Sequence, residues 1–202
     1  MKKTFPLIFL IILSSFPSLG FCLFPETEKD YRALPPFCKA RSTPNSPAYQ
    51  AWDKRLGNSF IHLHHYCSAL HTLNVYRTDP RYNKIEKARL LESALGGIKY
   101  MEENATPTFL LFPHIYATKA DIYLEQKNNG EAIRYLSKAI QTNPKFILGY
   151  TKLFDLYYKL GEKELASEIL NKALAIKPQS KALNKRLAKL QGKSESKPAN
   201  KI

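Results

Sequence analysis

Two cysteines and a group of histidines are the residues of this sequence whose types and spacing could do chemistry. His64, Cys67 and His71 stand at i, i+3 and i+7, which would place all three on one stripe of a helix. Cys38 could reach that stripe from a preceding segment. Because imidazole and thiolate groups bind zinc and copper, these residues could form a metal centre. A metal- or redox-linked periplasmic protein is therefore one hypothesis for this chain.

The segment 1–22 has the composition of an export signal. Two lysines precede an apolar run over residues 5–13, and a small-residue cleavage site follows at residues 18–20. The apolar run is shorter than the roughly 20 residues that span a bilayer. We therefore expect a periplasmic or secreted protein after cleavage of the signal, with cleavage after Gly20 as the best fit and cleavage after Cys22 as the second choice. Lipoprotein anchoring at Cys22 is not favoured, because the bulky Phe21 precedes the cysteine.

A disulfide between Cys38 and Cys67 is the interpretation that we favour, ahead of the metal site and of two reduced structural thiols. An exported chain meets an oxidising compartment, where paired cysteines usually become disulfides. The sequence also lacks the CxxC spacing that many metal sites use. Closing a loop of about 29 residues would stabilise the fold by roughly 3 to 4 kcal/mol. We accordingly expect no cofactor.

The chain is strongly basic and has no catalytic motif. Its formal net charge of +14 falls to +12 when the two lysines of the signal are removed, since the signal contains no acid. Such an excess favours anionic partners. We expect an acidic protein or peptide, with peripheral contact to an anionic membrane surface as a further partner, and no nucleic acid. We do not expect an enzyme, because the sequence has no nucleophile elbow, phosphate-binding loop or HExxH motif.

The segments 113–146 and 147–180 repeat the same residue types at the same offsets. The matched pairs are Tyr116 and Tyr150, Tyr123 and Tyr157, Ala132 and Ala166, Leu136 and Leu170, Ala139 and Ala173, and Pro144 and Pro178. A fixed period of this length, about 34 residues, indicates a stack of helical hairpins. The alanines would let helices approach closely, and each proline would end the second helix of its unit.

The second unit, YTKLFDLYYKLGEKELASEILNKALAIKP, closely resembles the tetratricopeptide repeat family. The first unit departs from the pattern in two places: Lys119 replaces an apolar residue, and Gly130 falls three positions late relative to Gly161. The whole chain, with LPPFCKAR, HHYC and terminal repeats, also looks similar to uncharacterised exported bacterial tetratricopeptide proteins.

The resemblance implies an all-α fold, a right-handed superhelical stack of about three helical hairpins with a groove that binds peptides or proteins. By the geometry of the family, the groove side chains would be His114, Thr118, Asp121, Glu125, Leu148, Thr151, Lys152, Asp155, Tyr158 and Lys159. This mixture of charges differs from the clamp that some members use for a terminal carboxylate. A C-terminal peptide is therefore not the favoured ligand.

The expected segments run from the signal to a polar tail. They are a signal peptide (1–22), a proline-rich extended arm with a short helix (23–57), a divergent helical hairpin (58–112), two tetratricopeptide repeats (113–146 and 147–180), a capping helix (181–191) and a disordered tail (192–202). The divergent hairpin would serve as the first unit of the stack, because roughly three hairpins are needed for stability.

Local signals place the helices of the first half. Ser46 and Pro47 would start the short helix, which would end at Gly57. Asn58 or Ser59 would cap a longer helix over residues 60–76. A second helix, over about residues 83–103, would bury a face formed by Ile85, Ala88, Leu91, Leu95, Ile98 and Met101. Its Gly96 and Gly97 would mark either a close backbone approach, which we favour, or a kink.

These features together favour an exported protein-binding or peptide-binding scaffold. We hypothesise that it is an assembly or maturation factor for a cell-envelope complex.

Overall fold

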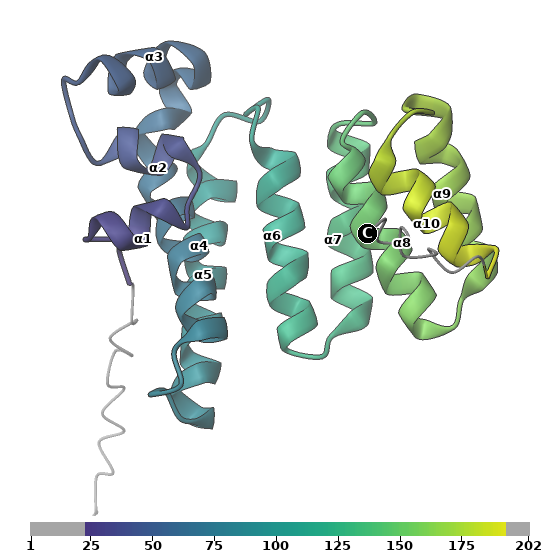
Figure 1. Cartoon of the computed structure of the whole chain (residues 1–202). Coiled ribbons are helices and arrows are strands. Elements are labelled where there is room, and N and C mark those ends of the chain that lie inside the picture. Colours follow the sequence, from purple (N-terminus) through teal and green to yellow (C-terminus); the bar gives the residue numbers. More distant parts are fainter. Residues whose placement is uncertain (1–22, 193–202) are drawn as a thin grey trace, which may run out of the picture.

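The computed structural model describes residues 23–192, which form a stack of antiparallel helices (Figure 1). The predicted signal and most of the predicted tail lie outside the described residues. Three hairpins follow one another along the stack: α4 (Leu63–Thr78) with α5 (Lys84–Asn104), α6 (Phe112–Glu125) with α7 (Asn129–Thr142), and α8 (Ile147–Leu160) with α9 (Lys163–Ile176). The helix α10 (Lys181–Leu190) ends the stack, so the predicted all-α hairpin architecture is confirmed.

The repeat positions have the packing that their residue types predict. Ala132, Ala139, Ala166 and Ala173 are completely buried between helices, which explains why small side chains recur there. Gly161 ends α8 in the left-handed conformation, at φ 84°. Its counterpart one repeat period earlier, Lys127, takes the same region at φ 59°, although it is not a glycine. The two turns therefore share one backbone path, and Gly130 is not the counterpart of Gly161.

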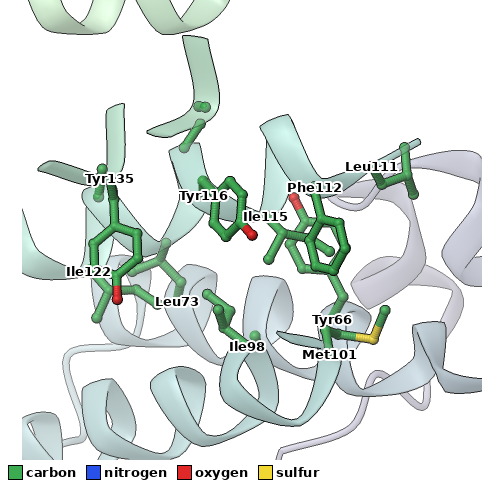
Figure 2. Close-up of a cluster of buried hydrophobic side chains, with 14 of the residues drawn as sticks. Tyr66, Leu73, Ile98, Met101, Leu111, Phe112, Ile115, Tyr116, Ile122 and Tyr135 are labelled. Atoms are coloured by element: carbon green, nitrogen blue, oxygen red, sulfur yellow. The ribbon is translucent and has the colours of Figure 1, made fainter. Parts of the chain in front are cut away.

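One continuous apolar core joins the divergent hairpin to the first repeat. Figure 2 shows Tyr66, Leu73, Ile98 and Met101 of α4 and α5 facing side chains of α6 and α7. Ile98, Met101 and the neighbouring Ile115 have no exposed surface. Because a single hairpin cannot bury its own apolar face, the divergent hairpin is stabilised as the first unit of the stack.

The helix α5 approaches α4 closely at one glycine. A Cβ atom at Gly97 would lie 2.7 Å from the backbone oxygen of His65, whereas a Cβ atom at Gly96 would meet nothing within 4 Å. The predicted close approach is thus confirmed, and Gly97 alone is responsible for it. The predicted inner face was wrong at its N-terminal end, since Ile85 is 68% exposed and Ala88 is also exposed. The first turns of α5 extend beyond the side chains that could cover them.

The arm is not extended, contrary to the sequence prediction. It contains α1 (Glu28–Arg32) and α2 (Pro36–Arg41), followed by α3 (Pro47–Leu56). Prolines prevent one long helix, yet Pro36 and Pro47 stand at the first positions of α2 and α3, where a missing N–H costs nothing. Ser46 caps α3, and the helix ends at Gly57 with φ 64°, as predicted.

The long helix of the first hairpin also begins differently from the prediction. A 3₁₀ segment, η1 (Gly57–His62), precedes α4, and no side chain caps it. The hydroxyl of Ser59 instead accepts a hydrogen bond from the backbone N–H of Thr106 at 2.9 Å. This hydrogen bond holds η1 against the residues that follow α5. Ser59 therefore links η1 to the C-terminal end of α5 and does not cap α4.

The capping helix covers the open end of the last repeat. Leu183 is completely buried, and Leu187 and Leu190 pack beside it against α8 and α9. Among residues 23–192, no helix is long and apolar enough to cross a membrane.

Candidate functional site

Most of the predicted groove residues reach the surface of α6 and α8. We call the surface that carries them the first-helix face, formed by His114, Asp121, Glu125, Leu148, Lys152, Asp155, Tyr158 and Lys159. Thr118 and Thr151 are buried, contrary to the prediction that they would contact a ligand. The hydroxyl of Thr118 donates to the backbone oxygen of His114 and contacts the Tyr66 hydroxyl, and that of Thr151 donates to the oxygen of Leu148.

Ion pairs connect consecutive first helices across this face. The ammonium of Lys152 on α8 donates to both carboxylate oxygens of Asp121 on α6, at 2.7 and 3.0 Å. Arg186 on α10 makes the same two-pronged contact with Asp155 on α8. The two acids are separated by one repeat period, and so are the two cations. The pairs therefore recur with the spacing of the hairpins.

A third ion pair continues the series toward the divergent hairpin. Nε of Arg77 on α4 lies 2.7 Å from Oε1 of Glu125 on α6. We call the three pairs, Arg77 with Glu125, Lys152 with Asp121 and Arg186 with Asp155, the ion-pair ladder. Each acid predicted in the groove is thus neutralised by a cation of the neighbouring helix. The ammonium of Lys152 is therefore already engaged by Asp121.

Two of the ladder cations were missed by the sequence reasoning. The repeat register carries a signal for Arg186, because that residue lies one repeat period after Lys152. No such signal exists for Arg77, since the divergent hairpin does not follow the period. Only the packing of α4 against α6 brings it to Glu125.

The cysteines are joined in a disulfide. Their Cα atoms are 5.6 Å apart, and both side chains are buried between α2 and α4. Because its sulfur is bonded to Cys38, Cys67 cannot also act as a thiolate ligand. Among the described residues, no group of three His, Cys, Asp or Glu side chains is placed to hold a metal. The alternative site of His64, Cys67 and His71 is therefore not assembled.

The histidines of α4 act as packing groups. The ring of His65 stacks on Tyr100 of α5 with centroids 3.6 Å apart, and the ring of His64 lies 4.2 Å from that of His65. Partial burial, followed by the neighbouring His64 and His62, lowers the pKa of His65 to about 4. Nδ1 of His64 lies 2.9 Å from the oxygen of Ile61, and burial lowers the pKa of this ring also. Neutral rings fit such a stack better than charged ones.

The arm is anchored to α4 at one end of the stack, far from α8 and α10 (Figure 1). The hydroxyl of Ser68 donates to the oxygen of Leu23 at 2.9 Å, and the amide of Asn74 donates to the oxygen of Ala33 at 3.3 Å. Together with the disulfide, these contacts hold the arm beside the divergent hairpin.

Comparison with known proteins identifies the repeated helices. Residues 123–191 match the model of the tetratricopeptide repeat. Over 77 residues the chain is 34% identical to the "Tetratricopeptide repeat and J domain-containing co-chaperone DNJ1" of Fusarium oxysporum f. sp. lycopersici, a match that covers 38% of this chain and 15% of that protein. The helices of residues 123–191 are thus similar to tetratricopeptide repeats both in sequence and in the hairpin geometry described above.

Proposed function

We propose that this protein is an exported scaffold that binds a protein or peptide partner on its first-helix face. The observation that carries the proposal is the ion-pair ladder, which holds α4, α6, α8 and α10 in a fixed register along that face. A surface whose helices are already ordered loses little conformational entropy when a partner binds. Tetratricopeptide repeats form interaction scaffolds, which agrees with this interpretation.

Several side chains on the face remain available to a partner. Leu148 is 45% exposed, Lys159 is exposed, and Tyr158 is half-buried. An apolar side chain, an aromatic ring and a cation on one helix suit a partner that buries a few side chains and also carries charge. The ladder acids are neutralised, so they do not repel an acidic partner as free carboxylates would.

The disulfide supports export, because such bonds persist in oxidising compartments. We propose that the protein works outside the cytoplasm, as an assembly or maturation factor for a cell-envelope complex. Thiol labelling of the protein in intact cells, followed by fractionation, tests this compartment. Finding both cysteines reduced, in a protein that fractionates with the cytoplasm, would contradict it.

A photo-crosslinking residue tests the binding face. The residue is placed at Leu148 on α8 and, in a matched variant, at Leu165 on α9, which is 41% exposed. Crosslinking in native cell envelopes is expected to give a discrete adduct from position 148 and none from position 165. The same adduct from both positions, or from neither, would rule out the first-helix face as the binding surface.

A further inference from the structure

The charge of the stack is concentrated at its C-terminal end. The helix α10 contains four cations and no acid, and α8 contains two lysines and one aspartate. The leucines of α10 pack inward against α8 and α9. Arg186 and Lys189 both lie against α8, through Asp155 and Tyr158 respectively. Two of the four cations of α10 therefore lie beside the first-helix face, where Arg186 is paired with Asp155.

The repeat register shows that Lys189 reverses a charge. Asp121 and Asp155 occupy one position of consecutive repeats, and each accepts a cation from the next first helix. The residue one repeat period after Asp155 is Lys189, a cation where the repeats have an acid. A partner side chain that packs against α10, as α10 packs against α8, would meet the cation of Lys189 in place of an acid. An acidic group is the one that fits.

The ammonium group of Lys189 is positioned against α8 by an aromatic ring. Its ammonium lies 4.3 Å from the centroid of the Tyr158 ring on α8. Lys159 follows Tyr158 on the same helix and is exposed. We call the surface formed by Tyr158, Lys159, Arg186 and Lys189 the α8–α10 corner. Since Asp155 balances only Arg186, the corner keeps two positive charges.

We propose that the α8–α10 corner binds an acidic segment of the protein partner, with Lys159 and Lys189 as the contacts to its carboxylates. The inference rests on the proposed function and specifies the chemistry of the partner. Charge complementarity is its basis: Lys189 lies over the Tyr158 ring, and the exposed Lys159 follows that tyrosine on the same preordered helix. Membrane binding is less well served, because Leu183 is completely buried and Leu187 and Leu190 pack against α8 and α9, so α10 has no fully exposed leucine to insert into lipid.

A binding measurement with a defined probe tests this proposal. The probe is a fluorescein-labelled peptide of alternating glutamate and serine, and its anisotropy is measured with the full chain at low and physiological salt. The variant Lys159→Gln with Lys189→Gln removes both contacts but leaves Arg186 and the ladder intact. The matched variant Lys163→Gln with Lys172→Gln removes the same charge from α9. Thermal melts verify that all proteins are folded.

The corner variant is expected to bind the acidic peptide about tenfold more weakly, whereas the α9 variant should stay within about twofold of the parent protein. A peptide with glutamine in place of glutamate should not bind. Equal losses in both variants would mean that only net charge matters and would overturn the proposal. Binding to phosphatidylserine vesicles or to duplex DNA that is tighter than peptide binding, and is lost in the corner variant, would also overturn it.

The crosslinking experiment at Leu148 separates this inference from the proposed function. Suppose that the corner variant no longer binds the acidic peptide but still forms the adduct at position 148. The partner then binds the first-helix face without using the corner, so the corner proposal fails and the proposed function stands. If position 148 gives no adduct in the parent protein, the proposed function itself fails.

Discussion

The ammonium of Lys152 on α8 lies 2.7 Å from Oδ1 of Asp121 on α6, so the first helix of one repeat is tied to that of the next. Arg186 and Asp155 make the same contact one repeat period later. The two pairs show that the repeated ion-pair contact continues to α10, a helix that the sequence predicted only as a capping helix. They also define which charges on the first-helix face are already paired within the protein.

A double-mutant cycle on Lys152→Met and Asp121→Asn should give a coupling free energy of about 1 kcal/mol in urea unfolding. The side chains of this pair are only 29% and 18% exposed, so water screens them incompletely. The pair of Lys172 and Glu168 serves as the control, because its side chains are 59% and 57% exposed. Its coupling should be no more than about 0.5 kcal/mol. Equal coupling in the two pairs would contradict a structural role for the ladder.

Gly97→Ala should destabilise the fold by about 1 to 3 kcal/mol, because the new methyl group would overlap the backbone oxygen of His65. The neighbouring Gly96→Ala has open space and should stabilise by roughly 0.5 to 1 kcal/mol through helix propensity. Urea unfolding of the two variants measures both effects. Effects of the same sign would refute the close approach of α5 to α4 at Gly97.

Lys119→Met should destabilise the protein by about 2 to 3 kcal/mol. The ammonium of Lys119 lies 2.6 Å from Oε2 of Glu102 and 4.3 Å from the Tyr135 ring centroid, in a largely buried site between α5 and α6. Burial is the largest single effect and opposes its charge, but the interactions with Glu102 and Tyr135 together outweigh burial and raise the pKa of Lys119. Removing the lysine leaves a carboxylate without its cation.

The second substitution Glu102→Leu should restore most of the stability lost in Lys119→Met, because an apolar pair can replace a buried ion pair at little cost. The thermal midpoint of the double variant measures this recovery. A double variant as unstable as Lys119→Met alone would show that the lysine acts through something other than Glu102.

Replacing both Cys38 and Cys67 by serine should lower the free energy of unfolding by about 3 kcal/mol, because the bond closes a loop between residues with a sequence separation of 29. The arm should also become sensitive to protease, since its helices are short and depend on α4. With reductant present, the parent protein should fall to the level of the variant. A parent protein unaffected by reductant would contradict the bond.

Stability should fall as the pH drops from about 6.5 toward 4, in part because of His65. The pKa of His65 is lowered to about 4 in the folded protein, so the unfolded chain binds the proton more readily across that window. Allowing for the exposed part of the ring, its share is about 1 kcal/mol. His65→Phe preserves the stack on Tyr100 and should reduce the loss between pH 7 and pH 4.5. An unchanged pH dependence would remove His65 from this role.

The sequence by itself determined the hairpins of the second half and the positions of their buried alanines. Those features repeat at a fixed spacing and depend on contacts within one hairpin or with the next, so Ala132 and Ala166 reveal their role by their register. Sequence also indicated Cys38 and Cys67 as partners, since they are the two cysteines that follow the predicted signal. The sequence favoured a close backbone approach over a kink at Gly96 and Gly97, because glycine is costly inside a helix, but it did not show that only Gly97 makes the approach.

Only the tertiary structure decided how the arm folds and where the charges pair. A helix as short as α2 is marginal alone and forms because the disulfide and α4 hold it, which no local pattern in the arm encodes. In the sequence, Lys119 departs from the apolar residue that the repeat pattern expects. The structure explains the departure, because Lys119 pairs with Glu102 on α5. Arg77 and Glu125 are likewise joined by packing between a divergent hairpin and a repeat. Residues in segments that share no repeat period have no fixed spacing in the sequence that could predict their contact. Such contacts are therefore visible only in the tertiary structure.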